Sequence, residues 1–211
     1  MARSTAFLPA LAAPIGIARA AIAGAALLGL ALLGPSLAGG PAALAAGMDG
    51  SGLQPGLIAT YDYTYGGVRH LDEVPWDDIT TSGWNPEPIP FLDHTFRNQD
   101  VFASGVEEKV VMFITGFIHL AQPGDYAFVA KSNDGVRVFI DGKQILEDPD
   151  VHRDRFSEPG TMTVGAPGWY PLDIQYFQRK GTAALSLYWQ PPGTDNLVPV
   201  PADAYRHKPR G

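Results

Sequence analysis

The chain has 211 residues, of which 15 are Lys or Arg and 22 are Asp or Glu, so its formal net charge is −7. This acidity disfavours nucleic acids and anionic membrane surfaces as partners, because both select for clustered basic residues. Cysteine is absent, which excludes disulfides. The stability of the protein must therefore come from a buried core, to which a bound ion could add.

The first 45 residues have the features of a secretory signal peptide. Their only charges are Arg3 and Arg19, an apolar run extends over 20–33, and Ala43-Leu44-Ala45 is a small-residue cleavage site. The run is shorter than the ~20 apolar residues of a spanning helix, so we expect export and cleavage without stable membrane insertion. The mature protein is then expected to be secreted, periplasmic or at the cell surface, and loss of the two arginines takes the net charge from −7 to −9.

A single domain is expected at 56–207, after a small, polar linker at 46–55. Its first strand, 56–63, alternates in the way typical of a half-buried strand. Residues 64–108 have many breakers and little periodicity, and they predict a long excursion with short elements. Four aromatic side chains are expected to attach the excursion to the core: Trp76, Trp84, Phe91 and Phe96.

The sequence pattern in the middle of the domain predicts three more strands. Residues 109–120 are apolar on both faces, which indicates a central strand covered on both sides. A second strand is expected at 126–131. After the polar turn Ser132-Asn133-Asp134-Gly135, the third strand, 136–140, places valines and isoleucine on one face and ends at Asp141-Gly142, the dipeptide of a type I′ hairpin.

Residues 144–158 are charged and irregular, and they predict a solvated loop. Asp148, Asp150 and Asp154 are spaced somewhat like calcium-loop ligands, but the bend glycine and the terminal glutamate of an EF-hand are missing. We therefore expect these carboxylates to pair with Arg153 and Arg155 or to be solvated.

Three strands are predicted near the end of the chain, at 161–164, 169–178 and 184–190. The turn at 179–181 is expected to bring the last of them back to pair with 169–178. The mature chain has no long apolar pattern with a 3.6-residue period. The fold should therefore be all-β, an antiparallel sandwich or barrel.

The order of these motifs resembles the PA14 domain family over about 56–205. The most specific pieces are Gly-Asp-Tyr-Ala-Phe at 124–128, Ser-Asn-Asp-Gly-Val-Arg-Val-Phe-Ile-Asp-Gly-Lys at 132–143, Trp169-Tyr170 with Ile174-Gln175-Tyr176-Phe177, Leu185 to Trp189, and Pro191-Pro192-Gly193. The resemblance implies a PA14-like antiparallel β-sandwich or barrel. Such modules are often appended to enzymes, adhesins or toxins, and carbohydrate binding is the function usually proposed for them.

The resemblance also implies a site. In the fungal adhesins of the family, two adjacent aspartates at the position of Asn133 and Asp134 hold a calcium ion that coordinates sugar hydroxyls. Asn133 and Asp134 are thus the implied metal-binding and ligand-binding residues, and calcium is the implied cofactor. Because Asn133 is uncharged, the ion should bind more weakly than at a pair of aspartates. The alternative is a turn in which both side chains bond to backbone amides. Trp169 is a further candidate for ligand binding, by stacking on a sugar ring, unless it belongs to the core.

No catalytic motif is present in the sequence. It contains no Gly-x-Ser-x-Gly elbow, no His-Glu-x-x-His and no cysteine nucleophile, and its five histidines have no zinc-like spacing. We therefore expect an exported, non-catalytic binding module that recognises glycans with the help of calcium. Two alternatives are a cell-surface or matrix module for protein interaction, using 64–108 as its contact surface, and a small glycoside hydrolase.

Overall fold

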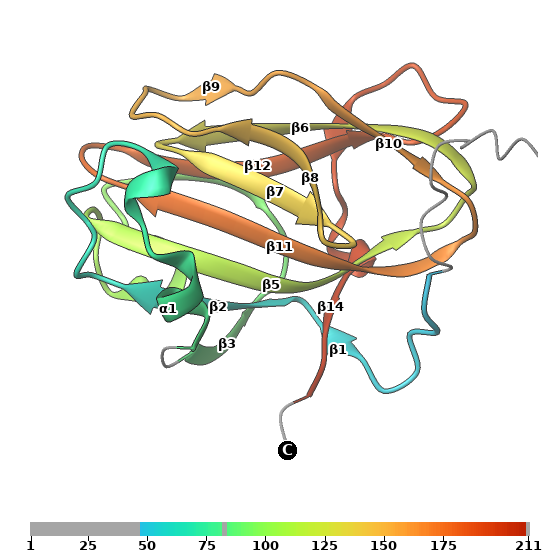
Figure 1. Cartoon of the computed structure of the whole chain (residues 1–211), viewed down its shortest axis with the longest axis horizontal. Coiled ribbons are helices and arrows are strands. Elements are labelled where there is room, and N and C mark those ends of the chain that lie inside the picture. The colour runs from blue at the N-terminus through green and yellow to red at the C-terminus, as the bar shows by residue number, and fades with distance from the viewer. Residues whose placement is uncertain (1–46, 82–83, 210–211) are drawn as a thin grey trace, which may run out of the picture. The chain divides into compact units, whose positions relative to one another are not determined.

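The computed structural model of the chain describes residues 47–81 and 84–209. The expected signal peptide at 1–45 lies outside the described residues, and so do the side chains of 81–86, Trp84 among them. The described part consists of two antiparallel sheets that pack face to face (Figure 1). Besides strands it contains one short helix, α1 (Trp76–Thr81), and three single 3₁₀ turns at Leu71–Glu73, Phe102–Ser104 and Ala202–Ala204.

The first sheet has eight strands, and its centre is the pair β5 (Val110–Leu120) and β11 (Gly168–Gln178). These two strands pair over their full length, with Val110 opposite Gln178 and Leu120 opposite Gly168. On its other side β11 pairs with β7 (Val136–Ile140), which pairs with β8 (Lys143–Asp148). The second edge of β5 is shared by β2 and β14, which in turn pair with β3 and β1. These four are β1 (Gln54–Pro55), β2 (Leu57–Asp62), β3 (Trp84–Ile89) and β14 (Tyr205–His207).

The second sheet has six strands and is centred on β6 (Gly124–Asn133) and β12 (Ala183–Gln190). Asn133 lies opposite Ala184, and Ala127 lies opposite Gln190. Two strands share the outer edge of β6 and two share the outer edge of β12. They are β9 (Arg155–Phe156) and β10 (Gly160–Val164) beside β6, and β4 (Asp93–Arg97) and β13 (Val198–Pro199) beside β12.

The inner faces of the two sheets enclose the main hydrophobic core. Side chains from both sheets that are at most 2% exposed include Val110, Met112, Ile114, Val136, Val138, Ile174, Tyr176, Tyr126, Phe128, Leu185 and Leu187. Full burial of one aliphatic or aromatic side chain of this kind contributes about 1.5–3 kcal/mol. The sandwich interior is therefore the main source of stability in a chain without disulfides.

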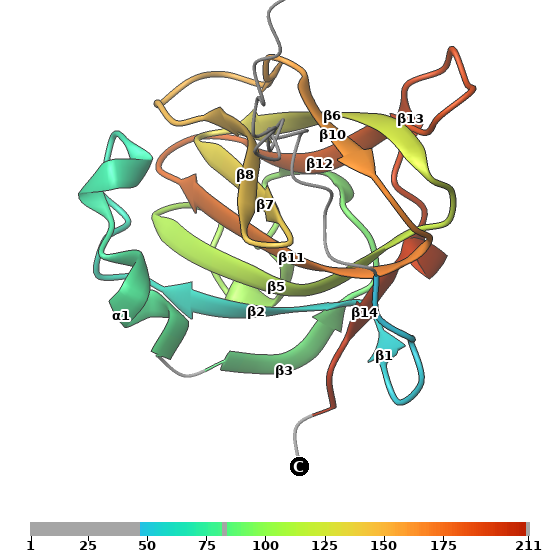
Figure 2. The same ribbon diagram turned by 45° about the vertical axis from the view of Figure 1, so that its right-hand side comes forward.

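A second, smaller cluster covers part of the outer face of the first sheet. Val111 of β5 and Phe177 of β11 point outward and are buried by residues of the excursion, namely Val68, Leu71, Val74 and Ile79. Figure 2 shows α1 and the preceding segment beside the ends of β2 and β5. The predicted covering on both sides is thus confirmed for the first part of residues 109–120, where the excursion covers the outer face, whereas Thr115 and Phe117 border an open hollow.

The expected all-β class and the hairpin at Asp141-Gly142 are also confirmed. Both residues have positive φ, 54° and 71°, as a type I′ turn requires. Along β7, Val136, Val138 and Ile140 are fully buried, whereas the intervening side chains are partly exposed. The expected role of Phe96 in the core is confirmed and Trp76 packs at the edge of the second cluster, but Phe91 is 39% exposed and does not anchor the excursion.

Three local expectations were wrong. The strand at 184–190 does not pair with 169–178, because the connection at 179–182 crosses from one sheet to the other. Residues 143–148 are the strand β8, not a solvated loop, since they complete the hairpin. The expected linker already contains β1, which pairs with β14.

Candidate functional site

Three connections meet at one end of the sandwich, on the left in Figure 1. They are the β6–β7 turn with Asn133 and Asp134, the segment between β8 and β9, and the loop between β11 and β12. Together they line an open hollow of about 580 Å³, called here the loop hollow. Its lining residues are Asn133, Asp134, Val151, His152, Arg153, Asp154, Lys180, Gly181 and Thr182.

The Asp134 carboxylate is buried at the bottom of this arrangement and is 3% exposed. Its Oδ1 accepts a hydrogen bond from the backbone N–H of His152 (3.1 Å), and its Oδ2 accepts one from the backbone N–H of Arg179 (2.8 Å). Asp134 therefore ties the two other connections of the hollow to the β6–β7 turn. Burial raises the pKa of this carboxyl above its ordinary value, and the N–H donors oppose that rise.

Asn133 is fixed from both its backbone and its side chain. The Tyr176 hydroxyl donates to the Asn133 carbonyl oxygen (2.7 Å), and the Asn133–Asp134 peptide is cis. The Asn133 amide Nδ2 donates to Asp154 Oδ1 (3.0 Å) and, at 3.4 Å, to the Thr182 hydroxyl. Both predicted residues are thus part of a built network, in which Asp134 does bond to backbone amides and Asn133 reaches across the hollow.

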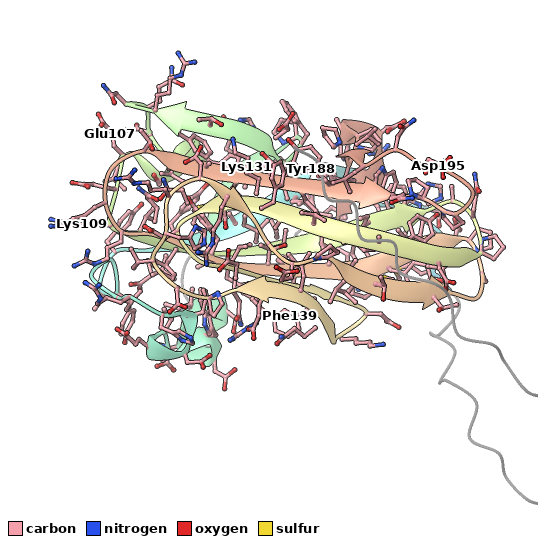
Figure 3. The ribbon with its side chains drawn as sticks, turned by 90° about the horizontal axis from the view of Figure 1, so that it is seen from above. Glu107, Lys109, Lys131, Phe139, Tyr188 and Asp195 are labelled. Carbon is pink, nitrogen blue, oxygen red and sulfur yellow. The ribbon has the colours of Figure 1, made fainter. Side chains whose placement is uncertain are left out.

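Asp154 has a second partner, Lys131. The Lys131 Nζ lies 3.4 Å from Asp154 Oδ2 and comes from β6, where Lys131 stands opposite Ser186 of β12. Figure 3, which looks from above, shows Lys131 beside Tyr188 on the outer face of the six-stranded sheet. Asp154 therefore accepts from Asn133 with one oxygen and meets an ammonium with the other.

The neighbouring Asp148 behaves as the sequence predicted for these carboxylates. It forms a bidentate ion pair with Arg155, and its Oδ2 lies 3.2 Å from Nε2 of the buried His152 ring. The His152 nitrogen and the carboxylate are within ion-pair distance but are not aligned for a hydrogen bond. Asp148 thus supports the segment 148–155 from below and does not line the hollow.

The oxygens at the loop hollow have the chemistry that calcium prefers, so the donor set can be tested for a fit. Both Asp134 oxygens already accept backbone N–H groups, and Asp154 is occupied by Asn133 and Lys131. Within residues 47–81 and 84–209, no group of three or more His, Cys, Asp or Glu side chains is arranged to hold a metal ion. In this arrangement the carboxylates of the hollow are engaged by protein donors and are not gathered around a cation.

Trp169 does not join Asn133 and Asp134. It lies near the start of β11, seven residues before Tyr176, which corresponds to ~23 Å at about 3.3 Å per residue of strand. Its ring stacks on His119 (4.7 Å between centroids), and the Arg206 guanidinium lies over it at 5.2 Å. Its partners are therefore protein groups at the opposite end of the sandwich.

Sequence reasoning missed most of the hollow. Asp154 was identified only as a loop carboxylate, and Lys131, Lys180 and Thr182 were not identified at all. Lys131 precedes Asn133 by two residues on β6, whereas Asp154, Lys180 and Thr182 follow it by about 20 to 50 residues. No local sequence motif connects these residues. Only the sheet crossing at 179–182 brings the last two next to Asn133.

A comparison with family models decides the family. Residues 97–201 match the model of the PA14 domain. The chain belongs to the PA14 domain family. The match starts at the end of β4 and includes the β6–β7 turn, the hollow and β12, which agrees with the resemblance drawn from the sequence motifs.

Solved structures with the same fold include other PA14 domains. The "PA14 sugar-binding domain from RTX adhesin" is 16% identical, with a TM-score of 0.51, and covers 72% of this chain and 98% of its own. The epithelial adhesin 6 A domain from Candida glabrata, solved in complex with Galβ1-3GlcNAc, is 13% identical, with a TM-score of 0.55 and coverages of 74% and 88%. At such identities the likeness establishes the fold alone.

An anti-sigma factor domain-containing protein from Clostridium clariflavum is also similar, with 19% identity, a TM-score of 0.58 and 75% of this chain covered. The PA14 chain spans only about half of that protein, 49% of its length. A comparison with curated proteins finds no match. In the described part of the chain, no helix is long and apolar enough to cross a membrane.

Proposed function

We propose that this PA14 chain is an exported, non-catalytic carbohydrate-binding module and that its glycan binds in the loop hollow. The observation that supports this most directly is the network itself, in which Asp134 joins three separate connections around one open hollow that is lined mostly by polar and charged residues. A rigid frame of this kind lowers the entropy that a binding site loses when it takes up a ligand. Two proteins with the same fold are described as sugar-binding or as sugar complexes, and both are adhesins.

Recognition would rest on hydrogen bonds to sugar hydroxyls. Asn133 and Asp154 have acceptor capacity beyond the bonds they make in the network, and Thr182 is an exposed hydroxyl that can donate and accept. A typical hydrogen bond of this kind contributes about 0.5–1.5 kcal/mol net. A handful of them in an open hollow gives an affinity in the millimolar to micromolar range.

A hydrolase receives less support from the same geometry. Asp134 has the raised pKa of a general acid, but both its oxygens accept backbone N–H groups and it is 3% exposed. Asp154 is occupied by an amide and an ammonium. The two carboxyls are therefore not presented as the pair of accessible groups that a glycosidase uses, one to protonate the glycosidic oxygen and one to attack or to activate water.

The alternative of a protein-interaction module also has less support. The excursion at 64–108 was the expected contact surface, yet its buried side chains Leu71, Val74 and Ile79 cover the sheet instead. The apolar surface of the excursion is thus largely used within the molecule.

A steric block tests the proposed site without assuming which glycan binds. Thr182→Trp places a large ring in the hollow at an exposed position, and we expect it to lower glycan binding at least tenfold. The control is Thr161→Trp on β10. Thr161 is also exposed and stands opposite Ala127, which lies six residues and ~20 Å along β6 from Asn133. Binding is measured on a glycan array and then by titration calorimetry with the best hit. The proposal fails if no glycan binds, and the placement fails if both tryptophan variants bind like the parent.

A further inference from the structure

The lining of the loop hollow has as many cations as carboxylates, although the chain as a whole is acidic. Its lining contains the carboxylates Asp134 and Asp154 and the cations Arg153 and Lys180. Lys131, which does not line the hollow, is ion-paired to Asp154. The lining itself thus carries two cations and two carboxylates, in a chain with a net charge of −7.

Both carboxylates are bound by groups of the protein. Asp134 accepts from the backbone of His152 and Arg179, and Asp154 from Asn133 and Lys131. The ammonium of Lys131 thus neutralises Asp154 in the way that a bound cation otherwise would. A ligand entering the hollow meets carboxylates whose charge is already compensated.

The two lining cations are turned toward solvent. Arg153 and Lys180 are both exposed, and among the described residues neither side chain has a hydrogen-bond or ion-pair partner. They come from two different connections of the hollow, the segment before β9 and the loop after β11. An anion between them would be approached from two sides, and a planar guanidinium can bind a carboxylate or sulfate with two parallel hydrogen bonds.

We propose that the loop hollow selects an anionic sugar, one with a carboxylate or sulfate group, through Arg153 and Lys180, and that it does so without calcium. This inference rests on the proposed glycan-binding function and specifies its ligand class. Lys131 serves as the internal counterion of Asp154. The uncharged Asn133 fits this scheme because its amide donates to Asp154, whereas an aspartate there would add a third carboxylate.

The test compares ligands that differ only in charge. The full chain is titrated in the presence of EDTA with an oligogalacturonate, with its carboxyl-reduced neutral counterpart, and with 6-O-sulfated and unsulfated galactose. We expect at least one anionic ligand to bind about tenfold or more tightly than its neutral partner, and we expect high salt to remove most of that preference. Binding of the carboxylate, of the sulfate or of both distinguishes the two anionic groups.

Variants assign the preference to the two side chains. Arg153→Gln and Lys180→Gln should each reduce the preference several-fold, while Lys143→Gln, an exposed lysine in the β7–β8 hairpin, should leave it unchanged. Equal binding of charged and neutral ligands would overturn the inference and leave the proposed glycan binding intact. Binding that is lost in EDTA would overturn the calcium-independent site. Failure of every sugar on the array and in these titrations would overturn the proposed function as well.

Discussion

At the scale of single residues, the β6–β7 turn shows how an amide in place of a carboxylate changes the chemistry of a site. Asn133 has almost the shape of an aspartate but can donate, and its Nδ2 does donate to Asp154 at 3.0 Å. Two backbone N–H groups bind the oxygens of Asp134 and oppose the rise in its pKa that burial causes, and hydrogen bonds to a charged group contribute about 1.5–3 kcal/mol each. The donor of Asn133 and the acceptors of Asp134 are therefore both matched by groups of the protein.

Replacing the amide tests this view directly. Asn133→Asp would turn the hydrogen bond to Asp154 into a contact between two carboxylates beside the buried Asp134. We expect the variant to lose about 1–3 kcal/mol of unfolding free energy in EDTA, since it buries an uncompensated charge and removes a bond. Thermal or urea unfolding measures the loss.

Calcium provides the second half of that experiment. Millimolar calcium should restore much of the stability of the Asn133→Asp variant, because an added carboxylate creates an oxygen-rich site for the ion, and binding to the folded state alone stabilises it. The parent should show little change. A larger calcium effect on the parent than on the variant would contradict our interpretation of Asn133.

At the scale of elements, the loops are more informative than the strands. The hairpin at Asp141-Gly142 was predictable, since its two residues must both adopt positive φ and Asp-Gly is suited to this. The strand β8 after it was not, because Lys143–Asp148 is rich in charge and only its pairing with β7 identifies it. Likewise, nothing local distinguishes a hairpin at 179–182 from a crossing between sheets.

The glycine of the hairpin gives an element-level prediction. Gly142 has a φ of 71°, and a Cβ there would contact nothing, so the cost of Gly142→Ala comes from the backbone alone. We expect a loss of about 1–2 kcal/mol of unfolding free energy, the cost of a left-handed conformation for an L-residue. Gly67→Ala is the matched control, because Gly67 is exposed, has no positive φ and also has open space around it. Urea unfolding of both variants measures the difference, and equal losses would argue against the type I′ turn.

At the scale of the whole described domain, the sequence predicted the class, the order of most strands and the family, because these depend on alternation, turn residues and ordered motifs. It located Asn133 and Asp134 but not their surroundings. The hollow depends on long-range pairings, such as Asn133 opposite Ala184 and Asp134 bonded to the backbone of Arg179. Trp169 was grouped with the site only because it is a large aromatic residue, and the length of β11 separates it from Asn133.

The excursion connects stability to the hollow. The Leu71 N–H donates to the Pro149 carbonyl (3.0 Å), the Val151 N–H donates to the Arg69 carbonyl (3.1 Å), and Val151 lines the hollow. The Leu71 side chain packs in the cluster that includes Phe177, whose backbone pairs with Asp134 and Gly135. The small cluster thus supports two of the three connections that form the site.

Substitutions of two buried leucines distinguish support of the hollow by the small cluster from a general loss of stability. Leu71 and Leu120 are both 0% exposed, but Leu120 lies at the other end of β5, opposite Gly168, ten residues and ~34 Å from Val110. Leu71→Ala and Leu120→Ala should each lower the unfolding free energy by about 2–5 kcal/mol, the usual cost of such a cavity. Only Leu71→Ala should also weaken glycan binding, by several-fold, when both variants are titrated at a temperature where they remain folded. If the two variants bind equally well, the small cluster stabilises the domain without supporting the hollow, and the contacts at Pro149 and Val151 do not position the site.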